Sequence, residues 1–135
     1  MSANETTLEL AWTFRLKNER NARVRCPVLA NGTAYVTFSY DKRGFFDSTL
    51  FAFDASTGSQ KWSKTIDHVS SEPVVAEDGT IYWGSFDGNV YALDQLGETV
   101  WKEPGAAANV SIPILVGNDR LIVSEIVFGC TQNLL

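Results

Sequence analysis

The sequence contains few of the residues that mark specialised protein classes. Cys26 and Cys130 are the only cysteines among 135 residues. They could pair, but one distant pair is neither a disulfide framework nor a metal-binding knuckle. No apolar run approaches the ~20 residues of a transmembrane helix. The chain starts with polar and acidic residues rather than a basic cap and an apolar core, so we expect no signal peptide here.

Positive charge is also scarce. There are 11 lysines and arginines against 16 aspartates and glutamates, which gives a formal net charge of −5. A generic nucleic-acid-binding protein needs a basic face, so we expect no nucleic-acid partner. The 44% content of hydrophobic residues and the length of the chain suit one folded domain, residues 1–135.

The clearest positive signal is an internal repeat. Four landmarks recur at a spacing of 39 or 40 residues, namely Ala52 and Ala92, Asp54 and Asp94, Gly58 and Gly97, and Trp62 and Trp101. Trp12 closes a similar phrase near the start of the chain. The first copy is longer because of an insertion around residues 40–48. Several landmarks at one period indicate repeated supersecondary units.

Each unit has the texture of short strands joined by turns. Residues 73–76 are apolar, residues 80–83 are β-branched and aromatic, and residues 90–94 alternate again. Asp87-Gly88 suits a tight hairpin turn. No useful helical period is present. Four antiparallel strands in about 40–45 residues are typical of one β-propeller blade, so we expect an all-β propeller.

The phrase from Ala52 to Trp62, AFDASTGSQKW, resembles the repeat of the pyrroloquinoline-quinone-like (PQQ-like) propeller family. Residues 83–94 are similar to the segment that precedes this phrase in the family. Quinoprotein alcohol dehydrogenases, the outer-membrane assembly lipoprotein of the BamB type and many sensor proteins share the repeat. The resemblance covers nearly all of residues 10–125 and implies fold more strongly than function. The family is often periplasmic or exported, which leaves the compartment of this chain open.

The repeated residues have structural roles that need no ligand. The resemblance implies that the tryptophan of each outer strand docks between adjacent blades. The alanines leave room where sheets approach closely, the aspartates accept backbone N–H bonds, and the glycines allow the turn before the outer strand. This structural set is Trp12, Ala52, Asp54, Gly58, Trp62, Ala92, Asp94, Gly97 and Trp101.

The repeats predict an incomplete ring. We expect an outer closing strand at residues 9–14, complete blades at residues 24–62 and 69–101, and a partial blade at residues 110–135. Propellers need four to eight blades to close, so about two blades and parts of two others leave open faces. Such edges favour self-association or a protein partner, and the chain reads as a fragment of a larger propeller.

Two segments are candidates for partner binding. Arg23 and Arg25 belong to a basic stretch, residues 15–25, which is either a solvated loop or a contact for an acidic partner or anionic ligand. Residues 1–60 hold seven basic and six acidic side chains, and residues 61–135 hold four and ten. Phe45 and Phe46 lie in the insertion, either exposed for interaction or folded onto the neighbouring blade.

His68 is the only histidine, in a segment expected near the mouth of the central channel. Asp67 and Ser70 are close to it in sequence, yet no nucleophile motif supports a triad, so His68 is a possible interaction residue rather than a catalytic one. The resembling dehydrogenases carry adjacent cysteines and a calcium-binding Glu-Asn-Asp set. This sequence has no Cys-Cys pair, and no motif supports such a set.

We therefore expect no catalytic residue, cofactor site or metal site, and we expect that the chain is not an enzyme. The leading hypothesis is a non-catalytic PQQ-like propeller that acts as a scaffold for protein contacts. The alternative is a fragment of a quinone-dependent dehydrogenase whose active site lies outside this chain. The missing cysteine pair and ligand set favour the scaffold without excluding the fragment.

Overall fold

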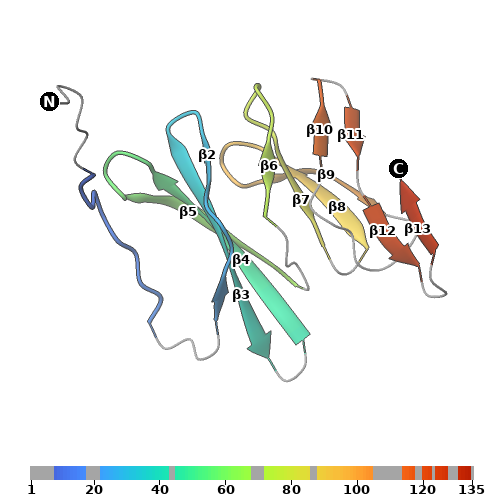
Figure 1. Cartoon of the computed structure of the whole chain (residues 1–135), viewed down its shortest axis with the longest axis horizontal. Helices are drawn as coiled ribbons and strands as arrows, with labels where there is room; N and C mark the ends of the chain where they lie inside the picture. The colour runs from blue at the N-terminus through green and yellow to red at the C-terminus, as the bar shows by residue number, and fades with distance from the viewer. Residues whose placement is uncertain are drawn as a thin grey trace, which may run out of the picture.

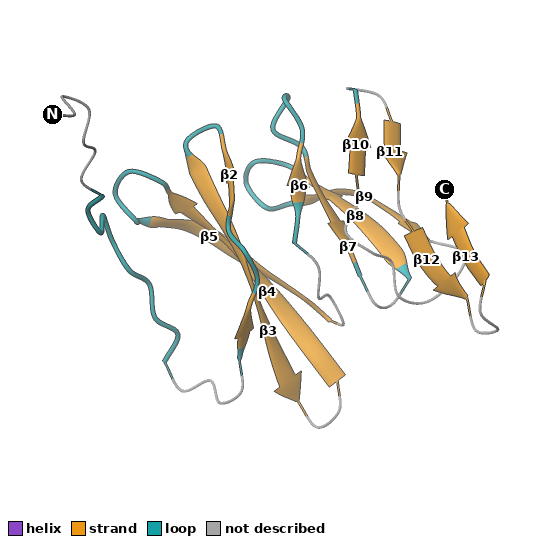
Figure 2. Ribbon diagram, viewed as in Figure 1, coloured by secondary structure: helices purple, strands orange, loops and turns teal. Residues whose placement is uncertain are grey.

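The structure is a computed structural model of the chain, which describes residues 8–17, 22–42, 45–67, 72–85, 88–104, 114–117, 120–122, 124–127 and 131–134. Every regular element in these ranges is a β-strand (Figures 1 and 2). The all-β expectation is therefore confirmed. β-Branched and aromatic residues fill the strands, and Gly-containing turns separate them.

The first sheet, which we call blade 1, is antiparallel throughout. It contains β1 (Arg23–Val24), β2 (Val28–Ala30), β3 (Thr33–Lys42), β4 (Phe45–Asp54) and β5 (Gln60–Asp67). Its order is β1-β3-β4-β5, and β2 also pairs with β3. Because β1 and β2 lie along the same edge of β3, they are two pieces of one edge strand, and blade 1 has four strand positions.

The second antiparallel sheet, which we call blade 2, repeats this order. It contains β6 (Val74–Val75), β7 (Ile81–Gly84), β8 (Asn89–Leu93) and β9 (Thr99–Pro104). Two shorter antiparallel pairs follow along the chain: β10 (Ile114–Val116) with β11 (Arg120–Ile122), and β12 (Ser124–Val127) with β13 (Thr131–Leu134). Figure 1 shows them beside blade 2, on the side away from blade 1.

The two blades share a local irregularity at the same place. Ala52 pairs with Trp62 and Ala92 pairs with Trp101, and the register shifts immediately after each alanine. A bulge of this kind bends the strand and increases its twist. The sequence repeat is therefore also a repeat of backbone geometry.

One buried cluster lies between the blades. Side chains alternate across a strand, so one face of blade 1 points toward blade 2. From blade 1 this face contributes Tyr35, Leu50, Ala52 and Ile66; from blade 2 the facing residues are Ile81, Trp83, Tyr91 and Leu93. Trp83 is fully buried. This interface, which we call the blade 1–2 junction, is the apolar core that joins the two sheets.

A second cluster covers the opposite face of blade 1, which we call its front face. It consists of Ala34, Val36, Phe38, Tyr40, Phe51 and Phe53, with Trp12 and Leu16 from residues 8–17 packed against it. Phe14 contacts Phe51 and Phe53, with ring centroids 5.2 and 4.7 Å apart. The front face is therefore aromatic and only partly covered by the N-terminal segment.

One sequence expectation needs correction here. Residues 9–14 were expected to form an outer strand, but residues 8–17 form no strand in this structure, because no described strand pairs with them. The insertion around residues 40–48 lengthens one hairpin, in which β3 and β4 have ten residues each and pair along their whole length.

Candidate functional site

The tryptophan of blade 1 reaches across to blade 2. The indole nitrogen of Trp62 donates a hydrogen bond of 2.7 Å to the carbonyl oxygen of Gln95. The ring lies on Gly97, where an added Cβ would stand 2.7 Å from Trp62 Cε3. Gly97 also has φ +81°, a conformation that other residues rarely adopt. Glycine is thus required here both by the turn and by the ring.

Trp12 makes the same contacts one blade earlier. Its indole nitrogen donates to the carbonyl oxygen of Ala55 at 2.9 Å, and a Cβ on Gly58 would lie 2.7 Å from Trp12 Cγ. Ala55 and Gln95 each follow the repeated aspartate. The N-terminal segment therefore places a tryptophan on blade 1 as β5 places one on blade 2.

Trp101 differs from both. It packs on Tyr82, with ring centroids 5.8 Å apart, much as Trp62 packs on Tyr35 at 6.0 Å. However, Trp101 is 36% exposed, and within the described ranges no glycine turn covers it. The expectation that Trp101 is buried between sheets is therefore wrong for this structure, in which none of the described residues supplies Trp101 with an acceptor turn like that of Gly97.

The repeated aspartates close the turns that receive the tryptophans. The side chain of Asp54 accepts hydrogen bonds from the backbone of Ser56 and Thr57 and from the Ser56 hydroxyl. Asp94 accepts two from the backbone of Leu96 and Glu98. The Ser56 hydroxyl, followed by the backbone donors, lowers the pKa of Asp54 to about 2, because each bond favours the carboxylate.

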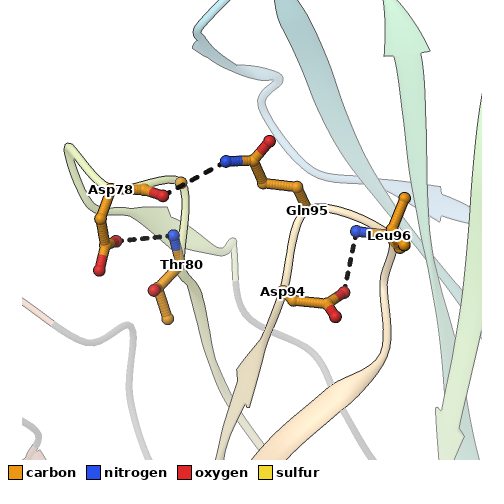
Figure 3. A pocket seen from close by; sticks show the side chains of 6 residues that line it. Asp78, Thr80, Asp94, Gln95 and Leu96 are labelled. Atoms are coloured by element: carbon orange, nitrogen blue, oxygen red, sulfur yellow. Dashed lines mark hydrogen bonds between the residues drawn. The ribbon is translucent and has the colours of Figure 1, made fainter.

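A small open pocket lies beside the Asp94 turn (Figure 3). It has a volume of about 290 Å³ and is lined by Asp78, Gly79, Thr80, Asp94, Gln95 and Leu96. The Gln95 amide donates to the Asp78 carbonyl oxygen, and Asp78 accepts from the backbone of Thr80, which lowers the pKa of Asp78. The polar groups labelled in Figure 3 are therefore largely occupied by turn-forming bonds.

The opposite end of the blade 1–2 junction is polar. Backbone pairing places Arg23 opposite Ser39, and the Arg25 amide donates to the Thr37 carbonyl oxygen at 2.9 Å. Residues opposite one another on paired strands share a face, so these side chains are on the face of blade 1 toward blade 2. Arg25 Nε and Thr37 Oγ1 are buried and have no hydrogen-bond partner among the described residues. Buried groups without partners are rare and favour a bound polar ligand or water.

Further small polar side chains line the same region. Ser39 and Ser48 are buried and hydrogen-bonded to each other at 2.9 Å, and Ser85 of blade 2 is fully buried. Figure 1 shows that β3 and β7 run toward this end of their blades and that β4 and β8 run back from it. We call this region the loop end. It was not identified from the sequence, because single serines and threonines in strands carry no motif.

Most of the remaining sequence candidates fall outside the residues or side chains that the structure describes. His68 lies outside the described residues, and so do the side chains of Phe45 and Phe46, although their backbones pair with Lys42 and Asp41 in the long hairpin. Cys26 is free and exposed, and Cys130 lies outside the described residues. The structure thus brings Arg23 and Arg25 together on β1 and its extension, and leaves the other candidates unplaced.

Two features are absent from the described part of the chain. In those ranges no group of three or more histidine, cysteine, aspartate and glutamate side chains could hold a metal ion. None of the described elements is a helix long and apolar enough to cross a membrane.

Comparison with curated proteins relates the chain to quinoprotein enzymes. It is 26% identical over 140 residues to a quinohemoprotein alcohol dehydrogenase of Comamonas testosteroni, covering 95% of this chain and 19% of that protein. It is 24% identical to a 1-butanol dehydrogenase (cytochrome c) of Thauera butanivorans, covering 93% of this chain and 19% of that protein. A quinone alcohol dehydrogenase subunit of Gluconobacter oxydans is 31% identical over 111 residues, covering 73% of this chain and 14% of that subunit.

These relatives overturn one expectation. The prediction that the chain is not an enzyme is contradicted, because the matched relatives are alcohol dehydrogenases. The prediction relied on the absence of a cysteine pair, and that absence concerns only one site of a large protein. The chain spans about a fifth or less of the length of these relatives, so their sites can lie largely outside the matched part.

Fold and family comparisons agree. BamB of Moraxella catarrhalis superimposes with a TM-score of 0.52 at 15% identity, covering 72% of this chain and 38% of that chain. This likeness confirms the propeller fold class. The family model described as outer membrane protein assembly factor BamB matches residues 2–132. The chain therefore belongs to the BamB-like family of PQQ-like β-propeller proteins.

Proposed function

We propose that this chain forms blades of a quinone-dependent alcohol dehydrogenase, with the loop end of the blade 1–2 junction turned toward an anionic ligand. The matched relatives support the reaction class, since three of them are alcohol dehydrogenases of the quinone or quinohemoprotein type. Their activity belongs to proteins several times longer than this chain. The proposal therefore concerns the part that this chain would play in such a protein.

The observation that carries the proposal is the pair of unpartnered polar atoms at the loop end. Arg25 Nε is a cationic donor, and Thr37 Oγ1 can donate or accept. Pyrroloquinoline quinone carries carboxylates, which arginine binds through charge-assisted hydrogen bonds. The residues present thus fit the anionic groups of the quinone. Thr37 is fully buried, so a ligand that reached both atoms would be largely removed from water.

When bound, the quinone would supply the electron acceptor for alcohol oxidation. The residues of this chain would hold and orient its carboxylates. Arg25 would supply charge, and Arg23, opposite Ser39 on the same face, would add to the positive potential. The Ser39–Ser48 hydrogen bond holds the wall of the site without using the donors of Arg25. The role of the chain is therefore binding and positioning.

The proposed organisation places successive blades at residues 24–62 and 69–101 within a single domain, residues 1–135. Residues 9–14 would supply the outer strand of a preceding blade, and residues 110–135 would begin a third one. The matched bulges after Ala52 and Ala92 support the equivalence of the two complete units.

The test uses the protein as its own cells make it. We expect extractable pyrroloquinoline quinone and dye-linked oxidation of a primary alcohol. Arg25→Gln should lower quinone occupancy about tenfold at limiting quinone, the loss that one charge-assisted hydrogen bond of about 1.4 kcal/mol predicts. Arg15→Gln, the same change at an exposed arginine of the N-terminal segment, is the matched control. Protein that contains no quinone and oxidises no alcohol after incubation with quinone and calcium would refute the proposal.

A second proposal concerns protein contacts. The family description names an outer membrane assembly factor, and this chain exposes apolar side chains in its N-terminal segment and on β9. Leu8 and Leu10 are 91% and 82% exposed, and Val100 is 62% exposed beside Trp101. Exposed apolar groups of this kind favour a protein partner or a second copy. Chemical cross-linking in cells, followed by identification of the linked peptides, tests this proposal: links from residues 8–17 or β9 to another polypeptide support it, and their absence opposes it.

A further inference from the structure

We propose that the loop end binds small monocarboxylates such as formate and acetate, and that these compete there with a carboxylate of the quinone. The competition rests on the proposed function, whereas the carboxylate site itself rests on two buried atoms, Arg25 Nε and Thr37 Oγ1. The consequence is a form of regulation: the protein takes up its quinone less readily where small carboxylates accumulate.

The site lies where the edge strand of blade 1 is interrupted. Between the pairs Val24–Phe38 and Val28–Tyr35, the edge has three residues and β3 has only two, so the edge contains a bulge. Arg25 is the first residue of this bulge, and its backbone amide still donates to a carbonyl oxygen of β3 at 2.9 Å. Bulges of this kind re-aim side chains and are frequent next to functional sites.

The hydroxyl of Thr37 is not part of the repeated pattern. Tyr35 and Tyr82 lie opposite the repeated alanines of blades 1 and 2. Two residues further along the strand, blade 1 has Thr37 and blade 2 has Gly84. Because glycine has no side chain, the blade fold does not need a hydroxyl at this position. A buried hydroxyl that the fold does not need, and that no described group satisfies, favours a bound ligand.

The two unpartnered atoms call for a negatively charged acceptor. Arg25 Nε can only donate a hydrogen bond, and the Thr37 hydroxyl can donate one as well. A carboxylate fits this pair, because it binds the edge of a guanidinium through Nε and one terminal nitrogen in two parallel bonds. The Thr37 hydroxyl would then donate to one of the same oxygens. The pair therefore suits a single planar carboxylate.

The number of donors at the loop end matches a carboxylate and falls short of a phosphate group. Ser39 and Ser48, the next buried hydroxyls on this face of blade 1, bond to each other at 2.9 Å. They are therefore not available to a ligand unless that bond breaks. A phosphate would bring more charge and further acceptor oxygens, and burying these without donors is costly. The ligand class is therefore a monovalent carboxylate.

Close packing limits what can reach Thr37. Thr37 and Ser48 are fully buried, and so is Ser85 of blade 2. Only a group of a few atoms fits beside them, such as the carboxylate head of a larger molecule. Arg25 is partly exposed, so the remainder of the ligand would lie on its side of the site. Because only the head is recognised, formate and acetate carry everything that this site binds.

Thermal melts of quinone-free protein test the carboxylate site. Sodium acetate should raise the melting temperature above that in sodium chloride of equal concentration, because a ligand that binds only the folded state stabilises it. Thr37→Val removes the hydroxyl and should weaken acetate binding about tenfold, whereas Thr37→Ser should retain it. Without acetate, Thr37→Val should melt at or above the temperature of the unmodified protein, since it removes an unsatisfied buried group.

A pair of arginine variants completes the melts. Arg25→Gln should weaken acetate binding about tenfold or more. Arg15→Gln, the same change at an exposed arginine of the N-terminal segment, should leave it unchanged. Equal melting temperatures in acetate and chloride overturn the carboxylate site. Stabilisation by acetate that persists in both Arg25→Gln and Thr37→Val overturns it too.

Quinone uptake separates this inference from the proposed function. The concentration of pyrroloquinoline quinone that gives half-maximal occupancy should rise with acetate while the maximal occupancy stays the same, as for two ligands of one site. Equal half-saturation in acetate and in chloride overturns the competition and leaves the proposed function intact. Protein that takes up no quinone in either medium refutes the proposed function and the competition with it, and the acetate melts, which use no quinone, still decide the carboxylate site.

Discussion

Blade 1 docks on blade 2 by the same contact that the N-terminal segment makes with blade 1. The two contacts differ in the backbone that holds the tryptophan. In both, an indole N–H donates to the carbonyl that follows a repeated aspartate, at 2.7 Å from Trp62 and 2.9 Å from Trp12. In both, the ring lies on a glycine with positive φ. However, Trp62 is held in a paired strand, whereas residues 8–17 form no strand.

The difference shows that the docking contact does not depend on a complete blade behind it. A tryptophan, a carbonyl and a glycine are enough for the local geometry. The two junctions differ in the apolar core around the tryptophan: at the blade 1–2 junction, eight buried residues join the two sheets. We therefore expect the Trp62 contact to contribute more to the free energy of unfolding than the Trp12 contact, although their local geometry is the same.

The largest effect is expected for Trp62→Ala, which should lower the free energy of unfolding by about 3 kcal/mol. The change removes a large apolar contact and leaves the Gln95 carbonyl without its donor. Trp12→Ala should cost about 1–2 kcal/mol, because its segment can move to fill the space. Chemical denaturation followed by circular dichroism measures both. Equal losses in the two variants would contradict the comparison.

Substitution of the receiving glycines sharpens the same comparison. Gly97→Ala should destabilise the fold by roughly 2 kcal/mol, since the left-handed backbone costs about 1–2 kcal/mol and the new Cβ meets Trp62. Gly58→Ala should cost less, because Trp12 can withdraw with its segment. Gly32→Ala is the control, since its φ is also positive and no atom lies within 4 Å of the added Cβ. Thermal melts of the three variants should rank in that order, and a reversed ranking would count against the packing argument.

The third tryptophan should matter less for the isolated chain. Trp101→Ala is expected to cost under about 1 kcal/mol, because its ring is 36% exposed and packs mainly on Tyr82. The same denaturation measurement checks it beside Trp62→Ala. A loss as large as that of Trp62 would show that Trp101 has an acceptor turn that the described residues do not supply.

The smallest effect is expected from acid titration of the Asp54 turn. Its folded pKa of about 2 lies below the ordinary value of 3.8, so the folded state favours the carboxylate. The stabilisation is complete above pH 3.8 and is lost as the pH falls toward 2. Asp54→Asn should therefore flatten the dependence of the melting temperature on pH in that window. If the melting temperature of Asp54→Asn fell with decreasing pH as steeply as that of the unmodified protein, other carboxylates would be responsible for the pH dependence.

Much of the fold could be predicted from the sequence, because it depends on local patterns. Alternation of apolar residues, Gly-containing turns and the 39–40-residue period specify strands and blades without long-range information. The family resemblance rested on the same repeated pattern, and the family model that matches residues 2–132 confirms it. Less could be predicted of the site. The buried Thr37 and the facing Ser85 carry no motif, and only the packing of two sheets brings their positions to one junction.

What the sequence determined by itself is the repeated unit: the order of strands, the aspartate and glycine of each turn, and the tryptophan that follows them. Tertiary structure alone decided how each unit is used. Among the described residues, it left residues 8–17 without strand pairing and buried Arg25 Nε without a partner, and it exposed Trp101 although Trp62 has a receiving turn. The physical reason is that turn and strand preferences act over a few residues, whereas burial depends on which sheet lies opposite.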